Sequence, residues 1–183
     1  MVTSILSISI ALWANIALNQ EESLICWKED HLLKWSDFQG IPDHSSPWNA
    51  VCAASIKVVG YWDSGLPNFE ITNCFDKKMS WTKDTTSISS LTHEQLHFDI
   101  AEIHARKMRK AVDSLRMEGV NGFDQYSIVV RSILGMRNKV DSLFDLETAH
   151  GIYEDQQELW FRKTREDLGQ SREFGQRLSK PPE

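Results

Sequence analysis

The sequence predicts an α+β fold in which an N-terminal antiparallel β-hairpin or sheet packs with three C-terminal helices. Residues 50–63 and 69–75 are rich in β-branched and aromatic side chains, and residues 64–68 between them are typical of a turn. After Thr85 the apolar residues recur every three or four positions, as they do on one face of a helix. No internal repeat or linker interrupts the chain, so we expect a single domain over residues 21–183.

Shorter strands are expected on both sides of this hairpin. Residues 32–38 indicate a strand that enters a loop containing Gly, Pro and Ser. Residues 77–81 indicate a further short strand after the hairpin. The two long strands should be antiparallel, because strands that are joined by a short turn run in opposite directions.

Three helices are predicted from the periodicity and from the residues that interrupt it. The first covers residues 89 to about 116, contains no Gly or Pro, and begins with Ser and Thr residues suited to an N-cap. A second helix covers residues 124–149, and a third covers residues 153–174. Glycines lie in both connections, where a residue that tolerates positive φ can end a helix. The apolar stripe of the first helix consists of Leu96, Ile100, Ile103, Met108, Val112 and Leu115.

The first predicted helix carries a His-Glu-x-x-His motif at residues 93–97. Positions i and i+4 lie on the same face of a helix, so the imidazoles of His93 and His97 can reach one metal ion. Glu94 then lies beside the open coordination position, where it can act on a bound water. The motif predicts a Zn²⁺ hydrolase site with His93 and His97 as metal ligands and Glu94 as the catalytic base. The alternative is a chance match in which both histidines are solvated or packed.

A straight first helix cannot supply the third metal ligand. His104 lies seven residues beyond His97, which is about 10 Å farther along a helix. An extended motif would need histidine at position 103, which holds Ile103. Asp99 and Glu102 lie near the motif but are rotated away from the histidine face. They remain alternatives, either as ligands or as hydrogen-bond partners that orient a histidine.

The end of the second predicted helix is a better source of that ligand. If the first two helices are antiparallel, this end returns beside the motif. His150 is then the predicted third ligand, and Glu147, one turn earlier, is the alternative. His150 could instead be an exposed histidine that interacts with the helix dipole. Tyr153 is a candidate oxyanion donor, although packing would equally explain a tyrosine there.

The N-terminal segment has the character of a secretory signal peptide. Residues 1–20 contain no charged residue, and residues 5–18 are largely apolar. This run is too short and too rich in serine for a membrane span. We therefore expect a secreted or periplasmic protein with no stable membrane span after removal of the leader. The alternative is that this segment forms the first buried helix or strand of the fold.

Composition excludes two further classes of protein. Hydrophobic residues make up 41% of the chain and charged residues 25%, which is typical of a globular protein and argues against wholesale disorder. The net charge is −6, whereas a general nucleic-acid binder would need a basic face. We therefore expect no nucleic-acid partner.

The three cysteines fit no zinc-binding spacing. If the protein is exported, one pair can be oxidised, and Cys52 and Cys74 are the expected pair because both lie in predicted strands. Cys26 would then remain unpaired. Three free thiols are an equally good alternative. No neighbouring residue offers a base that would make any of them a nucleophile.

Several stretches of the chain resemble one known family, the bacterial domain of unknown function 922. Its members are regarded as secreted, zinc-dependent proteases of zincin-like fold. The helical run His-Glu-Gln-Leu-His-Phe-Asp-Ile-Ala-Glu-Ile-His-Ala-Arg is the most specific part of the resemblance. Leu96 stands where the family often has glycine, and His104 stands where it often has an aromatic residue. The matching stretches are residues 33–40, Ser80-Trp81, residues 93–106, residues 145–151, Gln156-Gln157 and Trp160.

The resemblance implies a function as well as a fold. It implies zincin-like architecture with His93, Glu94 and His97 in the site, and it implicates residues 147–151 in the same site. Together with the motif, this predicts a zinc-dependent peptidase or other amide hydrolase that acts on a peptide or protein substrate. The alternative is a non-catalytic, zincin-like binding module of the cell envelope. Retention of Glu94 favours the enzyme, because a purely structural zinc site has no need of a base.

Overall fold

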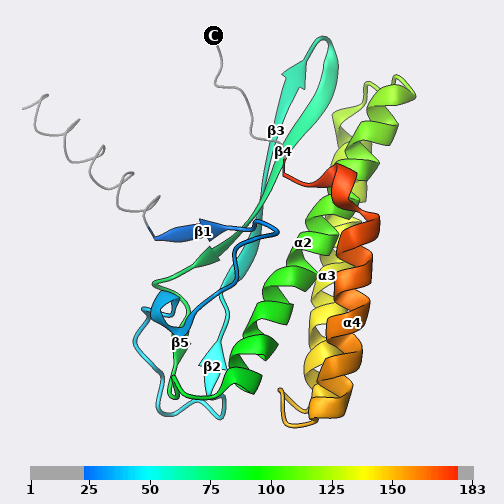
Figure 1. Ribbon diagram of the computed structural model, residues 1–183. Helices are drawn as coiled ribbons and strands as arrows, with labels where there is room; N and C mark the ends of the chain where they lie inside the picture. The colour runs from blue at the N-terminus through cyan, green and yellow to red at the C-terminus, as the bar shows by residue number, and fades with distance from the viewer. Residues whose placement is uncertain (1–22, 177–183) are drawn as a thin grey trace, which may run out of the picture.

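The computed structural model describes residues 23–176 and has an α+β architecture in which a small antiparallel sheet packs against three long helices (Figure 1). The predicted leader lies outside the described residues. The strands are β1 (Leu24–Cys26), β2 (Ala50–Val51), β3 (Ala54–Asp63), β4 (Leu66–Asp76) and β5 (Trp81–Thr82). The helices are α2 (Ile88–Met117), α3 (Phe123–Thr148) and α4 (Glu154–Gln170), with short 3-10 helices η1 (Trp35–Asp37) and η2 (Arg172–Phe174).

The predicted hairpin is confirmed as β3 and β4. The two strands pair antiparallel from Asp63↔Leu66 at the turn to Ala54↔Phe75 at the open end. The turn needs only two residues, Ser64 and Gly65, and both have positive φ, at 52° and 79°. Such two-residue turns match the right-handed twist of the strands. This is why β4 begins at Leu66, three residues earlier than the turn composition indicated.

The shorter strands differ from the prediction. The predicted strand over residues 32–38 is instead a loop that contains η1, because the Lys34 N–H donates to Asp37 Oδ2 at 2.8 Å and closes a tight turn. The predicted strand over residues 77–81 is a turn followed by β5. β5 pairs with β2 in a separate two-stranded sheet, and β1 pairs with β4 in the order β1-β4-β3.

The three helices are confirmed with small changes at their ends. α2 begins at Ile88, one residue before its predicted start, because Ser87 is the N-cap and its Oγ accepts from the Ser90 N–H at 3.1 Å. α4 ends at Gln170, and the last residues of its predicted range form η2. α2 lies between the sheet and the other two helices, so side chains on all of its faces are buried (Figure 1).

Two clusters of apolar side chains hold α2 in this position. Phe75 on β4 packs with Phe98 on α2, and farther along α2 Met108 packs in a second cluster with Tyr126 on α3. All four are fully buried. Since both clusters include β4, the sheet fixes which face of α2 turns toward α3, where the motif lies.

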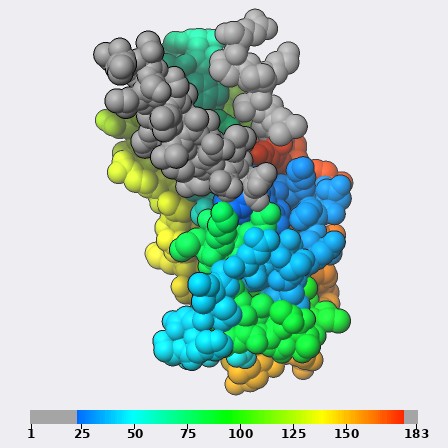
Figure 2. Space-filling model, turned by 90° about the vertical axis from the view of Figure 1, so that its left-hand side faces the viewer, coloured from blue at the N-terminus to red at the C-terminus, as the bar shows by residue number. Residues whose placement is uncertain are grey.

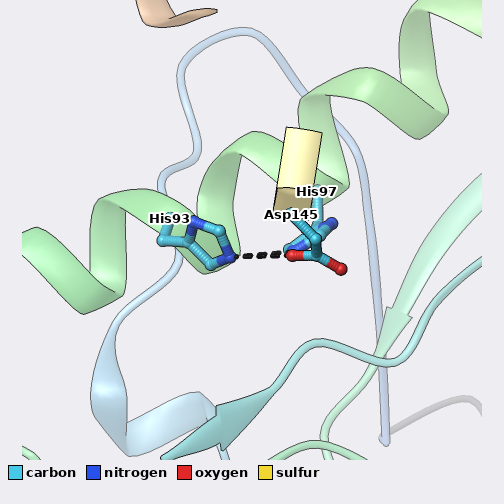
Figure 3. A group of neighbouring side chains, drawn as sticks. All are labelled: His93, His97 and Asp145. Carbon is cyan, nitrogen blue, oxygen red and sulfur yellow. Dashed lines mark hydrogen bonds and ion pairs between the residues drawn. The ribbon is translucent and has the colours of Figure 1, made fainter. Parts of the chain in front are cut away.

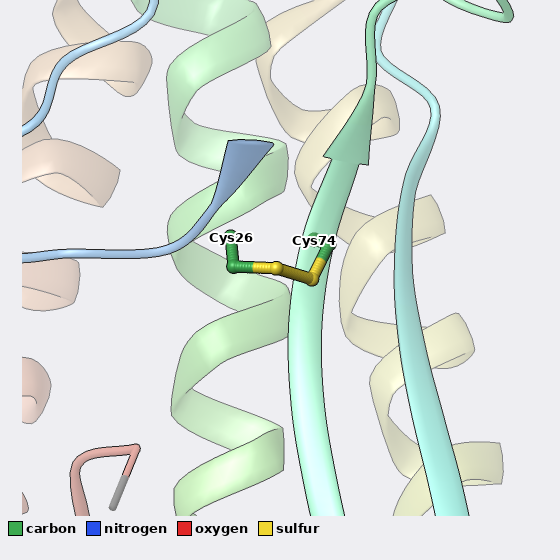
Figure 4. The surroundings of a disulfide bond; sticks show 2 residues. All are labelled: Cys26 and Cys74. Carbon is green, nitrogen blue, oxygen red and sulfur yellow. A yellow bond between two sulfur atoms is a disulfide. The ribbon is translucent and has the colours of Figure 1, made fainter. Parts of the chain in front are cut away.

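Cys26 and Cys74 form a disulfide, which corrects the predicted pairing of Cys52 with Cys74 (Figure 4). In the register of β1 with β4, Cys26 lies directly opposite Cys74. On its other side Cys74 pairs with Ser55 on β3, so Cys52 lies three positions out of register and remains a free thiol. The pairing of strands therefore decides the disulfide.

None of the helices over residues 23–176 combines the length and the apolar composition that a bilayer span requires.

Removal of the disulfide should destabilise the protein. The bond joins residues 48 positions apart, and closing a loop of this size contributes about 2–4 kcal/mol. We expect the Cys26→Ser/Cys74→Ser double variant to lose about that much free energy of unfolding, measured by urea titration with tryptophan fluorescence. Dithiothreitol should destabilise the wild type and leave the double variant unchanged. A wild type that is equally stable with and without reductant would contradict this pairing.

Candidate metal centre

The two motif histidines lie on one face of α2 and point at the same small volume (Figure 3). One helical turn separates them, and their Nε2 atoms are 3.2 Å apart. Both side chains are largely buried, with exposed fractions of 6% for His93 and 12% for His97. Ring nitrogens that converge in this way can bind one shared cation.

Asp145 on α3 completes a group of three possible ligands. Its Oδ1 lies 3.2 Å from His93 Nε2 and 3.1 Å from His97 Nε2. One ligand atom from each residue lies within 4.8 Å of the others, so the group could hold a metal ion. Figure 3 shows the Asp145 carboxylate close to His97 and facing the His93 ring.

The antiparallel packing of α2 and α3 creates this arrangement, as the sequence predicted. Asp145 lies opposite His93, and Asp141, one turn earlier on α3, lies opposite His97. The two acids share the i, i+4 spacing of the two histidines. That spacing was the signal in the sequence, since an acidic pair near the end of the second helix mirrors the motif on the first. The sequence prediction missed both acids, because it favoured His150 as the third ligand.

Asp141 orients His97. The His97 Nδ1 donates to Asp141 Oδ1 at 2.8 Å, which leaves Nε2 directed at Asp145. Behind it, the Arg137 guanidinium lies 3.6 Å from the same carboxylate oxygen. A carboxylate on the far side of a ligating histidine fixes the ring and raises its basicity. The structure gives this role to Asp141, where the sequence suggested Asp99 or Glu102.

Asp99 and Glu102 lie on other faces of α2 and hold the fold together. Asp99 Oδ1 accepts hydrogen bonds from Trp27 Nε1 at 2.7 Å and from Gln95 Nε2 at 2.8 Å. Glu102 Oε1 pairs with Arg106 Nε at 3.0 Å and with a second arginine, Arg109, at 2.9 Å. In residues 23–176 neither acid is hydrogen-bonded or ion-paired to a motif histidine, so their proposed roles as ligand or histidine partner have no support in this geometry.

His150 lies at the rim of the centre. It follows α3 in a turn where Ala149, His150 and Gly151 all have positive φ. Its Nδ1 is 3.3 Å from Asp145 Oδ1, and its ring packs on Trp48 with centroids 3.9 Å apart. The side chain is 43% exposed, and it is outside the group of three converging ligand atoms. Ligation by His150 therefore stays a prediction. Asp145 is the residue that the structure places within 3.2 Å of the Nε2 atoms of both motif histidines.

The two remaining candidates lie farther out. Glu147 accepts a hydrogen bond from Trp160 Nε1 at 2.9 Å, on the side of α3 that faces α4. Tyr153 is the residue before α4, is 58% exposed, and is not among the residues that line the cavity at the metal centre. The oxyanion role predicted for Tyr153 would need a movement of its side chain.

Charge within the centre is divided unequally between the two histidines. Burial favours neutral His97, but hydrogen bonds to Asp141 and Asp145 outweigh it and raise the pKa of His97 to about 10. For His93 burial is the larger effect, and the pKa of that imidazole is lowered. Burial would raise the pKa of Asp145, but the hydrogen bond from His97 and the nearby charge of that imidazole hold it well below its usual range. In the metal-free protein a proton on His97 thus balances the carboxylates.

Glu94 is buried beside this centre, next to His93 in the chain. Burial raises the pKa of its carboxyl to about 7, and the carboxylates of Asp145 and Asp141 add to the increase. The Cys52 N–H donates a hydrogen bond to the Glu94 carboxylate and partly offsets it. A carboxyl group with a pKa near neutrality can both take up and release a proton at physiological pH.

A cavity of about 390 Å³ opens onto the three ligands and Glu94. The cavity is also lined by residues 47–52 and by Ala149, His150 and Ile152 from the turn between α3 and α4. In Figure 2 the cyan segment around residue 50 lies beside the green segment that leads into α2. The cavity therefore gives a small molecule or a chain segment access to the buried carboxyl and imidazole groups.

The functional class of this centre rests on its own geometry. Comparisons of the chain with protein-family models, with characterised proteins and with solved structures give no significant match. The resemblance to domain of unknown function 922 therefore rests on the stretches of sequence quoted above.

Metal binding should release a proton. In the metal-free protein the pKa of His97 is about 10, so His97 carries a proton at neutral pH and must lose it to ligate a metal. We expect uptake of zinc to release about one proton from His97 between pH 6.5 and 8, and the affinity to rise about tenfold per pH unit there. Titration calorimetry in two buffers of different ionisation enthalpy measures the proton.

The Asp141→Asn variant is the matched control for this effect. It removes the carboxylate that raises the pKa of His97 and keeps the side-chain size, so zinc binding should release less than one proton. An affinity that does not change with pH in the wild type would contradict the charge assigned to His97.

Proposed function

We propose that the protein is a zinc-dependent peptidase, or a closely related amide hydrolase, with its centre at His93, His97 and Asp145. The observation that carries the proposal is the convergence of two imidazole nitrogens and a carboxylate oxygen within 4.8 Å, next to a buried glutamate. Three protein ligands with an open position are typical of catalytic zinc sites. A fully closed set of four ligands would be typical of a structural one.

The donor set favours zinc over calcium and magnesium. Two histidines and one carboxylate suit Zn²⁺, whereas Ca²⁺ and Mg²⁺ prefer oxygen ligands alone. The hydrogen bond from His97 Nδ1 to Asp141 adds the outer carboxylate that ligating histidines usually have. The residues present therefore fit a zinc ion without any rearrangement of the backbone.

The chemistry divides between the cation and Glu94. Zinc bound here would polarise a substrate carbonyl and lower the pKa of a coordinated water to about 7. Glu94, whose own pKa is about 7, takes the proton from the attacking water and passes it to the leaving amine. The hydrogen bond from the Cys52 N–H holds the Glu94 carboxylate in place during both transfers.

A zincin-like fold and membership of the resembled family belong to the same proposal. The motif lies on the long helix that packs against the sheet, and Asp145, the proposed third ligand, begins the stretch of the following helix, residues 145–151, that matches the resembled family. The Cys26–Cys74 disulfide supports export to an oxidising compartment, because such bonds are rare in reducing ones. A peptide or protein substrate follows from the proposed amide hydrolysis.

Metal content tests the ligand set. We expect purified wild-type protein to contain about one zinc per chain, and His97→Ala and Asp145→Ala each to lose it, measured by plasma mass spectrometry after dialysis. The His150→Ala variant should keep zinc, and exposed His31→Ala is the control. Loss of zinc in His150→Ala with retention in Asp145→Ala would make His150 the third ligand. Full retention in a His93→Ala/His97→Ala variant would refute the centre itself.

Activity of the Glu94→Gln variant tests catalysis separately from ligation. This change keeps the size of the side chain and removes the base, so zinc should remain while hydrolysis falls by about 100-fold or more. The control is Glu147→Gln, which alters an acid that faces Trp160 and should keep full activity. Peptide and amide libraries with mass-spectrometric readout supply the assay. A wild type that binds zinc and cleaves nothing in them would favour the non-catalytic binding module.

A further inference from the structure

Protein groups surround the His93 ring on the sides that do not face the proposed metal site. Phe144 stacks on it with ring centroids 4.5 Å apart and an interplanar angle of 23°. Its Nε2 faces Asp145 and the Nε2 of His97. Gly151 approaches so closely that a Cβ built on it would lie 3.3 Å from His93 Cγ. The other ring nitrogen of His93, Nδ1, is buried and makes no hydrogen bond of ordinary geometry with any residue in the described part of the chain.

Gln157 on α4 presents the complementary atom. The side chain is buried, with 5% exposed, and its Oε1 likewise makes no hydrogen bond of ordinary geometry with residues 23–176. The same imaginary Cβ on Gly151 that lies 3.3 Å from His93 Cγ lies 3.4 Å from Gln157 Oε1. An acceptor and a ring nitrogen, both buried and both without another partner, therefore border the same glycine.

The orientation of the Gln157 amide is fixed independently. Its Nε2 donates to the Ser89 carbonyl oxygen at 3.0 Å, in the first turn of α2. A backbone carbonyl can only accept, so the NH₂ group must face Ser89 and the oxygen must point the other way. That oxygen can itself only accept. Any hydrogen bond between it and His93 must therefore use a proton on Nδ1.

We propose that Gln157 is a positioning residue that accepts a hydrogen bond from His93 Nδ1 and so fixes the tautomer in which Nε2 is free to ligate the metal. The Ser89 carbonyl orients the Gln157 amide, and the amide oxygen in turn orients the His93 imidazole from the side away from the metal site. The inference rests on the proposed metal centre. It adds that α4, which supplies no ligand, sets the protonation state of one.

The two histidines are then held by different kinds of acceptor. His97 Nδ1 donates to a charged carboxylate, Asp141, and its pKa is raised to about 10. His93 faces a neutral amide, whose hydrogen bond raises its pKa less than burial lowers it. Each histidine is therefore oriented from behind, by Asp141 on α3 for His97 and by Gln157 on α4 for His93.

Gly151 makes this contact possible. Its φ of 87° and the absence of a side chain let the turn after α3 pass close beside both His93 and Gln157. A side chain there would press on the ring and on the amide oxygen together.

The tautomer of His93 can be read directly in wild-type protein. Long-range ¹H–¹⁵N correlation spectra of the metal-free, ¹⁵N-labelled full chain distinguish a protonated from an unprotonated ring nitrogen. We expect protonated Nδ1 and unprotonated Nε2 for His93 at pH 7.5. Protonated Nε2 with unprotonated Nδ1 would overturn the proposal, and this measurement needs no variant to fold.

Variants then test whether Gln157 is the cause. Gln157→Leu removes the acceptor, so the His93 tautomer should become mixed and zinc affinity should fall about 10- to 100-fold, the usual effect of losing such a partner. Gln157→Glu restores an acceptor oxygen and should restore the Nδ1 tautomer, although it cannot donate to Ser89. The exposed neighbour Gln156→Leu is the control and should change neither quantity. Unchanged tautomer and affinity in a folded Gln157→Leu variant would refute the role.

These outcomes separate the two proposals. If the wild type binds zinc and Gln157→Leu behaves like the control, the metal centre stands and the role of Gln157 falls. If the wild type binds no zinc, the proposed function falls, and the proposal for Gln157 falls with it because its purpose is to prepare a ligand.

Discussion

The antiparallel packing of α3 along α2 is the contact on which the rest of this centre depends, because it places two carboxylates of one helix opposite two imidazoles of the other. Phe144 holds the helices in register. It is fully buried, stacks on His93, meets the edge of His97 and packs on Trp160 of α4. Truncating such a residue costs about 3–5 kcal/mol in a typical core. Here it would also free the rings that the centre needs aligned.

Charge balance explains how so polar a cluster survives in the interior. Buried charges are tolerated when they are paired and hydrogen-bonded. A proton on His97 neutralises part of the charge on Asp141 and Asp145, and the raised pKa of about 10 records that pairing. Because this folded-state value lies above the ordinary histidine value, the pairing stabilises the metal-free fold fully below about pH 6.5, and the stabilisation is lost as the pH rises through 10. A bound cation would take over the role of the proton.

The remaining polar groups of α2 serve the fold, and in doing so they aim the motif. Glu102 pairs with two arginines, and Arg106 also donates to the Leu168 carbonyl at the end of α4. Asp99 binds the Trp27 indole near the start of the described chain. These contacts on the far faces of the helix fix its rotation about its own axis. As a result His93 and His97, which are one turn apart, both face α3. A helix free to rotate by one residue would turn both rings away from Asp145.

Local patterns in the sequence determined the hairpin, the three helices and the motif face, because strand and helix periodicity and turn chemistry depend on near neighbours. The tertiary structure decided which residues meet. Cys26 pairs with Cys74 because β1 aligns with β4, and residues 32–38 form a 3-10 turn because one carboxylate closes it. Asp145 faces the histidines, and His150 lies at the rim, because the rotation of α3 is set by distant packing around Phe144. The i, i+4 spacing of the two acids is present in the sequence, but local periodicity does not say which face of α3 meets α2, so the sequence identified the motif and not its partners.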